Sequence, residues 1–467
     1  MRPFRRLSAV LAVLVIALLA NLSWIQVIDA DNIRQQQGNT RLLLEQYNKP
    51  RGPILVEAAP IASSSRSAGE NIYQRSYVQG PLYAAATGYY SLLYGATGIE
   101  RVENGVLSGN DPRLFVDRVQ QLFAGRRQSG GAVTLTLDAN AQQAAFAGMS
   151  GLRGGVVAID AKTGAILVLV SAPSFDPQQL APNDPSRVRA EYNRLMADPE
   201  QPLANRALER TYTPGAPFAV VTAAAALASG RFTIGSMLPA TARYTVPGTN
   251  EQVKTADGKP CNQARRVTIG QALVTNCVTA LAWLGQAVGA DALANTAAQL
   301  GFGASLSTPL HASASRVPTV GIATASTGAS GVRATVLQLA LIAATVANSG
   351  TTMLPYLVRD VRGPDLALLE RTVPRQLGTA LSTAAASALA RAMRTAATRP
   401  DCSGCAMAGS IVHALSAPAA SSPAVTIAFS GRIAVAVVVE KSAAAKDGRH
   451  AAIATALAVL KAAQQVP

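Results

Sequence analysis

The chain has 467 residues, which is long enough for two or three domains and at least one large core, so it is not a small module held together by disulfides. Its 41 Lys and Arg residues exceed its 26 Asp and Glu residues, giving a net charge of +15, although only 14% of residues are charged. Such a surface favours anionic neighbours, such as phospholipid headgroups, acidic polymers or peptide carboxylates, or is simply a solvated basic surface. No compact basic stripe interleaved with aromatic residues occurs, which argues against nucleic acid as a partner.

Residues 7–28 form an uncharged apolar stretch, and three arginines stand among the six residues before it. The stretch exceeds a usual signal-peptide core, no clear small-x-small cleavage site follows it, and Trp24 lies near its outer end. We therefore predict a transmembrane anchor at residues 7–28, a cytoplasmic tail at residues 1–6, and residues 29–467 outside the plasma membrane. A cleaved signal peptide is the alternative.

Residues 29–150 mix short apolar runs with polar turns, which predicts a smaller N-terminal, membrane-proximal domain. Near its end, residues 134–137 (Thr-Leu-Thr-Leu) alternate like a strand, and a helix-like run follows Asp138. We expect Asp138 to cap this helix, which leads into the main domain at residues 151–467.

The main domain is predicted to have a strand pair at each end and helices between them. The strands are expected at 155–160, 165–171, 425–429 and 433–439, and the helices at 216–229, 269–288, 337–348 and 451–463. This order indicates a mixed α/β (α+β) fold in which helices cover an antiparallel sheet, and not a parallel doubly wound one.

Four cysteines, Cys261, Cys277, Cys402 and Cys405, allow three pairings, and a location outside the cytoplasm permits disulfides. Cys402 and Cys405 could instead close a tight, redox-labile loop or form half of a metal site. No second Cys-x-x-Cys and no suitably spaced His pair accompanies them, so we favour structural disulfides and predict neither metal nor cofactor.

Several segments follow one another in the order seen in a known family. They are Arg51-Gly-Pro-Ile54, residues 158–167 with 171–177, Asn205-Arg-Ala207, residues 212–227 and residues 343–358. Together they resemble class B penicillin-binding proteins, especially the actinobacterial PbpA-like cell-division group, over nearly the whole chain. The resemblance implies a dimerisation or pedestal-like N-terminal domain, a transpeptidase domain with the penicillin-binding and serine β-lactamase-like fold, and a role in peptidoglycan synthesis or cell division.

The family's cleft carries three motifs, and the first is Ser-x-x-Lys. Its hydroxyl attacks a carbonyl, and the lysine one helical turn away helps to remove the proton, so the two must share one helix face. In this sequence the matching positions are Ala216 and Ala219, and no other Ser-x-x-Lys occurs between residues 200 and 240.

The other two motifs, Ser-x-Asn and Lys-Thr-Gly, are also replaced. Asn276 and Val278 match the serine and asparagine of the second motif, which removes a proton-relay hydroxyl and a ligand for the substrate amide. Ser410, Ile411 and Val412 match the third motif, on a strand expected just past Cys405. The cation for a substrate carboxylate and the glycine that permits close approach of substrate backbone are thereby lost.

We expect no other constellation to take over the chemistry, and a new Ser–His pair is the disfavoured alternative. Ser410 and His413 are three residues apart on the expected strand, so their side chains would point to opposite faces. Loss of the nucleophile of a serine hydrolase can cost on the order of 10⁶ in turnover, equivalent to about 8 kcal/mol of barrier. We therefore predict no catalytic residue and a pseudo-transpeptidase.

The leading hypothesis is a membrane-anchored, catalytically inactive homologue that serves as a scaffold or binding partner in cell-wall synthesis or cell division. Its expected partners are the plasma membrane and either peptidoglycan precursors or wall-synthesis and division proteins. The alternatives are an active peptidoglycan D,D-transpeptidase that binds penicillin, a non-covalent sensor of muropeptides or β-lactams, and a gene product without a selected role.

Overall fold

A computed structural model provides the fold. It describes residues 49–66, 73–114, 129–306, 308–329, 331–398, 413–416, 423–440 and 448–464, together with residues 11, 13–18, 21 and 123. The predicted anchor therefore lies mostly outside the described residues. In the part of the chain that the structure describes, no helix is both long and apolar enough to cross a membrane.

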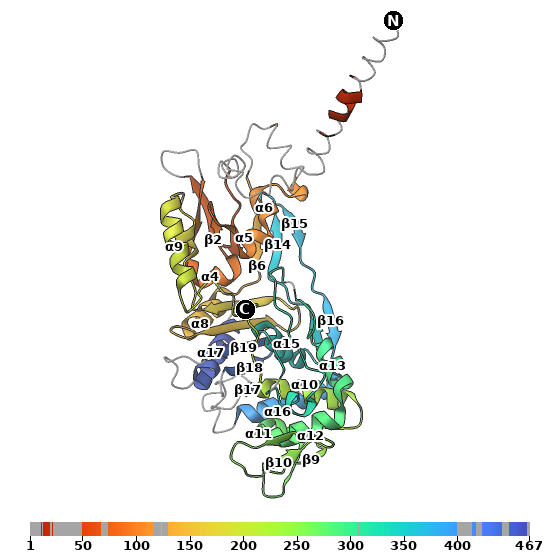
Figure 1. Cartoon of the computed structure of the whole chain (residues 1–467). Coiled ribbons are helices and arrows are strands. Elements are labelled where there is room, and N and C mark those ends of the chain that lie inside the picture. The colour runs from red at the N-terminus through yellow and green to blue at the C-terminus, as the bar shows by residue number, and fades with distance from the viewer. Residues whose placement is uncertain are drawn as a thin grey trace.

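A five-stranded antiparallel sheet forms the centre of the main domain (Figure 1). Its strand order is β17 (His413–Ser416), β18 (Ala424–Ser430), β19 (Ile433–Val439), β7 (Gly154–Asp160) and β8 (Ile166–Ala172). Both predicted strand pairs are confirmed. β19 also pairs with β7 along its whole length, from Ile433 opposite Asp160 to Val439 opposite Gly154, so the two ends of the domain share one sheet.

Both faces of this sheet are covered by helices, as predicted. Alternate strand residues contribute to two separate clusters, because successive side chains of a strand point to opposite faces. One face packs against α8 (Ala139–Gly148) and α17 (Gly448–Ala463), and the other against α15 (Val336–Ala347). The predicted cap of α8 is confirmed, since the Asp138 carboxylate accepts a hydrogen bond from Ala141 N–H.

Most other helices of the main domain lie below α15 in the view of Figure 1. They are α10 (Ala216–Ala228), α11 (Ile269–Thr275), α12 (Val278–Val288), α13 (Ala290–Gln299), α14 (Ile322–Ala325) and α16 (Thr383–Ala397). Three two-stranded sheets accompany these helices: β9 (Met237–Pro239) pairs with β12 (Arg266–Thr268), β10 (Arg243–Thr245) with β11 (Gln252–Lys254), and β13 (Thr351–Met353) with β16 (Gln376–Thr379). The predicted helices at 216–229, 337–348 and 451–463 are confirmed.

The prediction of one helix at 269–288 is wrong, because the helix is interrupted between α11 and α12. Asn276 ends α11 in the left-handed conformation (φ 50°, ψ 48°), which asparagine tolerates better than most residues. The next residue, Cys277, forms a disulfide with Cys261. The break therefore coincides with a covalent crosslink.

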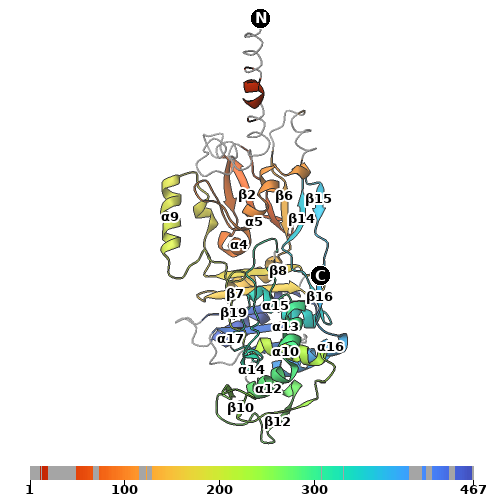
Figure 2. The ribbon, with the colours of Figure 1, turned by 45° about the vertical axis from the view of Figure 1, so that its right-hand side comes forward.

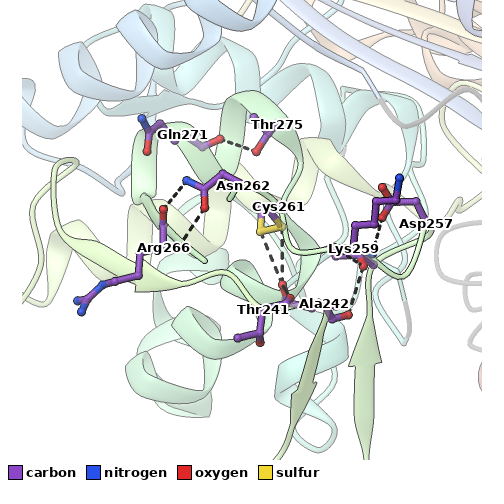
Figure 3. The surroundings of a disulfide bond; sticks show 12 residues. Thr241, Ala242, Asp257, Lys259, Cys261, Asn262, Arg266, Gln271 and Thr275 are labelled. Atoms are coloured by element: carbon purple, nitrogen blue, oxygen red, sulfur yellow. Dashed lines mark hydrogen bonds between the residues drawn. A yellow bond between two sulfur atoms is a disulfide. The ribbon is translucent and has the colours of Figure 1, made fainter. Parts of the chain in front are cut away.

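The disulfide joins the segment after the β10–β11 hairpin to the α11–α12 junction (Figure 3). The hydroxyl of Thr279 lies 3.8 Å from the Cys261 sulfur and 3.6 Å from the Cys277 sulfur, and it donates a hydrogen bond of 2.8 Å to the Thr241 carbonyl. Of the three pairings that the sequence left open, the structure shows Cys261–Cys277. Cys402 and Cys405 lie outside the described residues.

A second, six-stranded sheet lies above the first, five-stranded sheet in the view of Figure 2. Its strand order is β15 (Leu368–Arg371), β14 (Val358–Arg362), β6 (Ala132–Leu135), β1 (Ile54–Val56), β2 (Ala59–Arg66) and β3 (Tyr73–Tyr77). Near this sheet lie the helices α4 (Gly80–Thr87), α5 (Gly98–Val102), α6 (Asn104–Ser108) and α9 (Pro185–Ala197), and the short strands β4 (Tyr90–Ser91) and β5 (Gly95–Ala96), which pair with each other. β14 and β15 come from the late chain. The predicted division at residue 150 therefore does not separate the two sheets completely.

A buried ion cluster stabilises this N-terminal region. Glu100 is fully buried and lies 2.6 Å from both the Arg51 and Arg75 guanidinium nitrogens. Arg51 also stacks on the Tyr90 ring at 4.3 Å. Burial raises the pKa of Glu100, but the charges of Arg75 and Arg51 and their hydrogen bonds outweigh burial and bring the pKa below its usual value of 4.5.

We predict that Glu100→Gln lowers the free energy of unfolding at pH 7 by about 3 kcal/mol or more, because two buried guanidinium groups lose their counter-charge. Because the folded-state pKa of Glu100 is lowered, this contribution to stability is complete above the usual, unfolded-state pKa of the carboxyl group, and it is lost as the pH falls through the folded-state pKa. Denaturant titrations of both proteins from pH 7 to pH 3 should show their stabilities converging in acid.

The matched control is Glu191→Gln, which removes the exposed Glu191–Arg194 pair (2.7 Å). An exposed pair contributes only about 0.5 kcal/mol, so this variant should stay close to the parent. A Glu100→Gln loss no larger than that of the control would contradict the stabilising role of the buried cluster.

We predict that the double variant Cys261→Ser/Cys277→Ser loses about 3 kcal/mol of unfolding free energy, as expected when a loop of this length (sequence separation 16) is no longer closed. Denaturant unfolding without reductant measures the loss. Each single variant should lose nearly as much, since either one removes the bond. Unchanged midpoints in all three variants would show that the crosslink does not stabilise the fold.

Candidate functional site

The first motif positions lie at the start of α10. Gly215, with φ 62°, precedes the helix, and Pro217 occupies the first turn, where its missing N–H needs no partner. The Gly215 N–H donates to the Gly328 carbonyl at 3.0 Å. A Cβ on Gly328 would lie 2.1 Å from the Gly215 carbonyl oxygen, so this close contact between backbones requires glycine.

Ala216 and Ala219 face the same side of this helix and are buried, with exposed fractions of 3% and 1%. Their methyl groups provide neither a nucleophile nor a base. The structure thus places both residues where the sequence predicted them, on a buried helix, and they carry no acyl-transfer chemistry.

The second motif positions lie at the junction of α11 and α12, both of which contact α10. Asn276 is half-buried, and its side-chain oxygen is enclosed without a hydrogen-bond partner among the described residues. Val278 opens α12 and packs on a small apolar cluster that contains Val246 and Val253 of the β10–β11 hairpin region. Valine therefore contributes packing at this position.

The third motif positions, Ser410, Ile411 and Val412, lie outside the described residues, and their assignment stays a prediction. The strand that follows them, β17, is the edge strand of the central sheet and contacts α10. The chain directly after the third motif is therefore beside the helix that carries the first motif. His413 pairs in register with Phe429 of β18.

A polar network near the entry to α10 was not predicted from the sequence. Glu440 accepts a hydrogen bond from the Tyr212 hydroxyl at 2.9 Å and pairs with Arg206 at 3.3 Å and Arg153 at 3.1 Å. Burial raises the pKa of Tyr212, and the Glu440 charge raises it further. The network fixes the segment that leads into α10, and it contacts neither Ala216 nor Ala219 through these bonds.

Within the described ranges, no three or more His, Cys, Asp or Glu side chains form a group that suits a metal ion. Of the two cavities described below, both lined by described residues, neither is lined by Ala216, Ala219, Asn276 or Val278.

Comparison with known families identifies both parts of the chain. The family model for the penicillin binding protein transpeptidase domain matches residues 154–414, and that for the penicillin binding protein A dimerisation domain matches residues 51–133. The first match covers more than half of the chain.

Individual proteins agree with these matches. The chain is 39% identical over 399 residues to the peptidoglycan D,D-transpeptidase PbpA of Mycobacterium tuberculosis strain H37Rv, covering 83% of this chain and 81% of that protein. It is 38% identical over 395 residues to PbpA of Mycolicibacterium smegmatis, covering 82% and 80%.

Solved structures show the same fold. Penicillin-binding protein A from M. tuberculosis, as an imipenem acyl-enzyme complex, superposes with a TM-score of 0.85 at 37% identity, covering 90% of this chain and all of that chain. A D,D-transpeptidase domain from Eggerthella lenta gives a TM-score of 0.76 at 25% identity, covering 90% and 99%. With a PbpA-type dimerisation domain followed by a transpeptidase domain, this chain belongs to the penicillin-binding protein family.

Proposed function

We propose that this chain is a catalytically inactive member of its family that acts as a scaffold or binding partner in cell-wall synthesis or cell division. The observation that carries the proposal is Ala216, a buried methyl group at the helix start where an acyl-transfer enzyme needs its hydroxyl nucleophile. Ala219 one turn later and Val278 in α12 extend the loss to the base and to a substrate ligand. The relatives named peptidoglycan D,D-transpeptidase support the cell-wall context.

The proposal includes anchoring in the plasma membrane through residues 7–28, with the bulk of the chain outside the cytoplasm. The apolar stretch behind three arginines supports this orientation. The Cys261–Cys277 disulfide also supports it, because disulfides persist mainly in oxidising compartments.

An active D,D-transpeptidase is the second candidate, favoured by the acyl-enzyme complexes that M. tuberculosis penicillin-binding protein A forms with imipenem and penicillin G. It would need a nucleophile other than residue 216. A non-covalent sensor of muropeptides or β-lactams is the third candidate, and it would use the same region without acylation.

We predict that the full-length chain in detergent, incubated with fluorescent penicillin, gains no covalent adduct in gel fluorescence or intact mass. The physical reason is that Ala216 has no atom that can attack the lactam carbonyl. M. tuberculosis penicillin-binding protein A is the positive control. We expect Ala216→Ser/Ala219→Lys to remain unlabelled as well, since the second and third motifs are also replaced.

An adduct on the unmodified chain would overturn the inactive assignment, and peptide mapping would locate the true nucleophile. An adduct on the double variant alone would show that the cleft is otherwise intact and lacks only its nucleophile. That result would still support an inactive natural chain.

We further predict that the full-length chain, crosslinked in its own cells and purified, brings down proteins of wall synthesis or division. Ala216→Ser/Ala219→Lys should bring down the same set, because a scaffold role depends on surfaces and not on the buried start of α10. Recovery of no such protein in repeated crosslinking would count against the scaffold role.

A further inference from the structure

A cavity of about 320 Å³ lies between the N-terminal region and the main domain. Its walls come from α4 and α5 on one side, and from the segment after β8, from α9 and from residues 202–209 and 310–311 on the other. Figures 1 and 2 both show α9 standing alongside the helices of the six-stranded sheet. The volume falls within the range of small-ligand sites, which form preferentially between domains.

Aromatic rings form part of this cavity. The Tyr89 and Phe175 rings meet edge to face at 6.1 Å, and the Tyr192 ring stacks on Tyr94 at 3.7 Å. Burial raises the pKa of Tyr89 to about 12, with a further contribution from Tyr192, so its hydroxyl stays neutral at physiological pH. Met196 of α9 lines the same cavity and is 62% exposed. These side chains offer an apolar surface to a ligand.

Two lining residues of opposite charge are free to bind a ligand. Arg101 lies on α5 and Glu209 follows the segment at 202–205, and both are exposed. Within the described residues, neither side chain forms a salt bridge or hydrogen bond. The other polar side chains, such as Asn205 and Ser174, already bond to backbone carbonyls.

The second cavity, of about 310 Å³, differs in this respect. Its Arg113 pairs with Glu370 and with Asp111 at 2.8 Å, and its Asp360 is held by arginines at 3.0 Å. Most of its charged groups are thus satisfied within the protein, and we do not assign it a ligand.

We propose that the cavity lined by Arg101 and Glu209 binds a short peptide with a free carboxylate and a free amino group. The Arg101 guanidinium binds the carboxylate, the Glu209 carboxylate binds the ammonium group, and an aliphatic side chain packs against the rings of Tyr89, Phe175 and Tyr192. A neutral glycan would leave both charged groups without a counter-charge. None of the motif positions lines the cavity, so the inference stands independently of acylation at residue 216.

The test is calorimetric titration of the full-length chain in detergent with the tripeptide Ala-Leu-Ala, in its free, N-acetylated and C-amidated forms. We expect the free peptide to bind with a dissociation constant below about 1 mM. Arg101→Gln should weaken binding of the free peptide about tenfold or more and leave binding of the amide unchanged. Glu209→Gln should weaken binding of the free peptide similarly and leave binding of the acetylated form unchanged.

The control is Arg243→Gln on the β10–β11 hairpin, an exposed arginine at the opposite end of the molecule (Figure 1). It should bind all three peptides as the parent does. Binding that is absent at millimolar peptide, equal in all variants, or replaced by binding of neutral chitotriose would overturn the proposal. Unfolding midpoints of the variants equal to that of the parent confirm that they are folded.

Discussion

The pairing of β19 with β7 is the interaction on which the main domain depends. These strands come from opposite ends of the domain, and every residue of both is buried. The ladder therefore closes a long loop whose entropic cost must be offset by burying both sheet faces. α15 packs on one face of this sheet, where it contacts β7, β18 and β19, and α10 contacts β17 and β18. The buried position of Ala216 at the start of α10 follows from that arrangement.

Local patterns in the sequence predicted much of this arrangement. The hairpin strands, α10, α15 and α17, and the Asp138 cap were all recognisable because each depends on neighbouring residues only. The break at Asn276 was missed because the apolar pattern of 269–288 continues across it, and a single asparagine in a helical pattern carries little signal. Its cause is partly distant, since Cys261 holds Cys277 from another segment.

Features that depend on distant segments could not be predicted. β14 and β15 join the six-stranded sheet although they follow most of the main domain's helices in the chain, because their pairing with each other and with β6 depends on tertiary structure. The Glu100 cluster and the Glu440 network likewise bring together residues far apart in sequence. For the candidate site, the sequence placed Ala216 and Ala219 on a buried helix, which the structure confirms. The cavity lined by Arg101 and Glu209 could not be predicted, because its walls come from segments far apart in the chain.

The apolar residues at the motif positions and the buried charges elsewhere in the chain bear on its role. At the motif positions, Ala216, Ala219 and Val278 are apolar, and apolar residues there remove the cost of holding polar catalytic groups in a partly desolvated site. Elsewhere the chain keeps costly buried charges, with Arg51 and Arg75 both paired to a fully buried Glu100. Loss of any one partner there would leave an uncompensated charge, so an intact cluster argues for a fold that is maintained. A maintained fold with alanine at position 216 supports the binding or scaffold function that we propose.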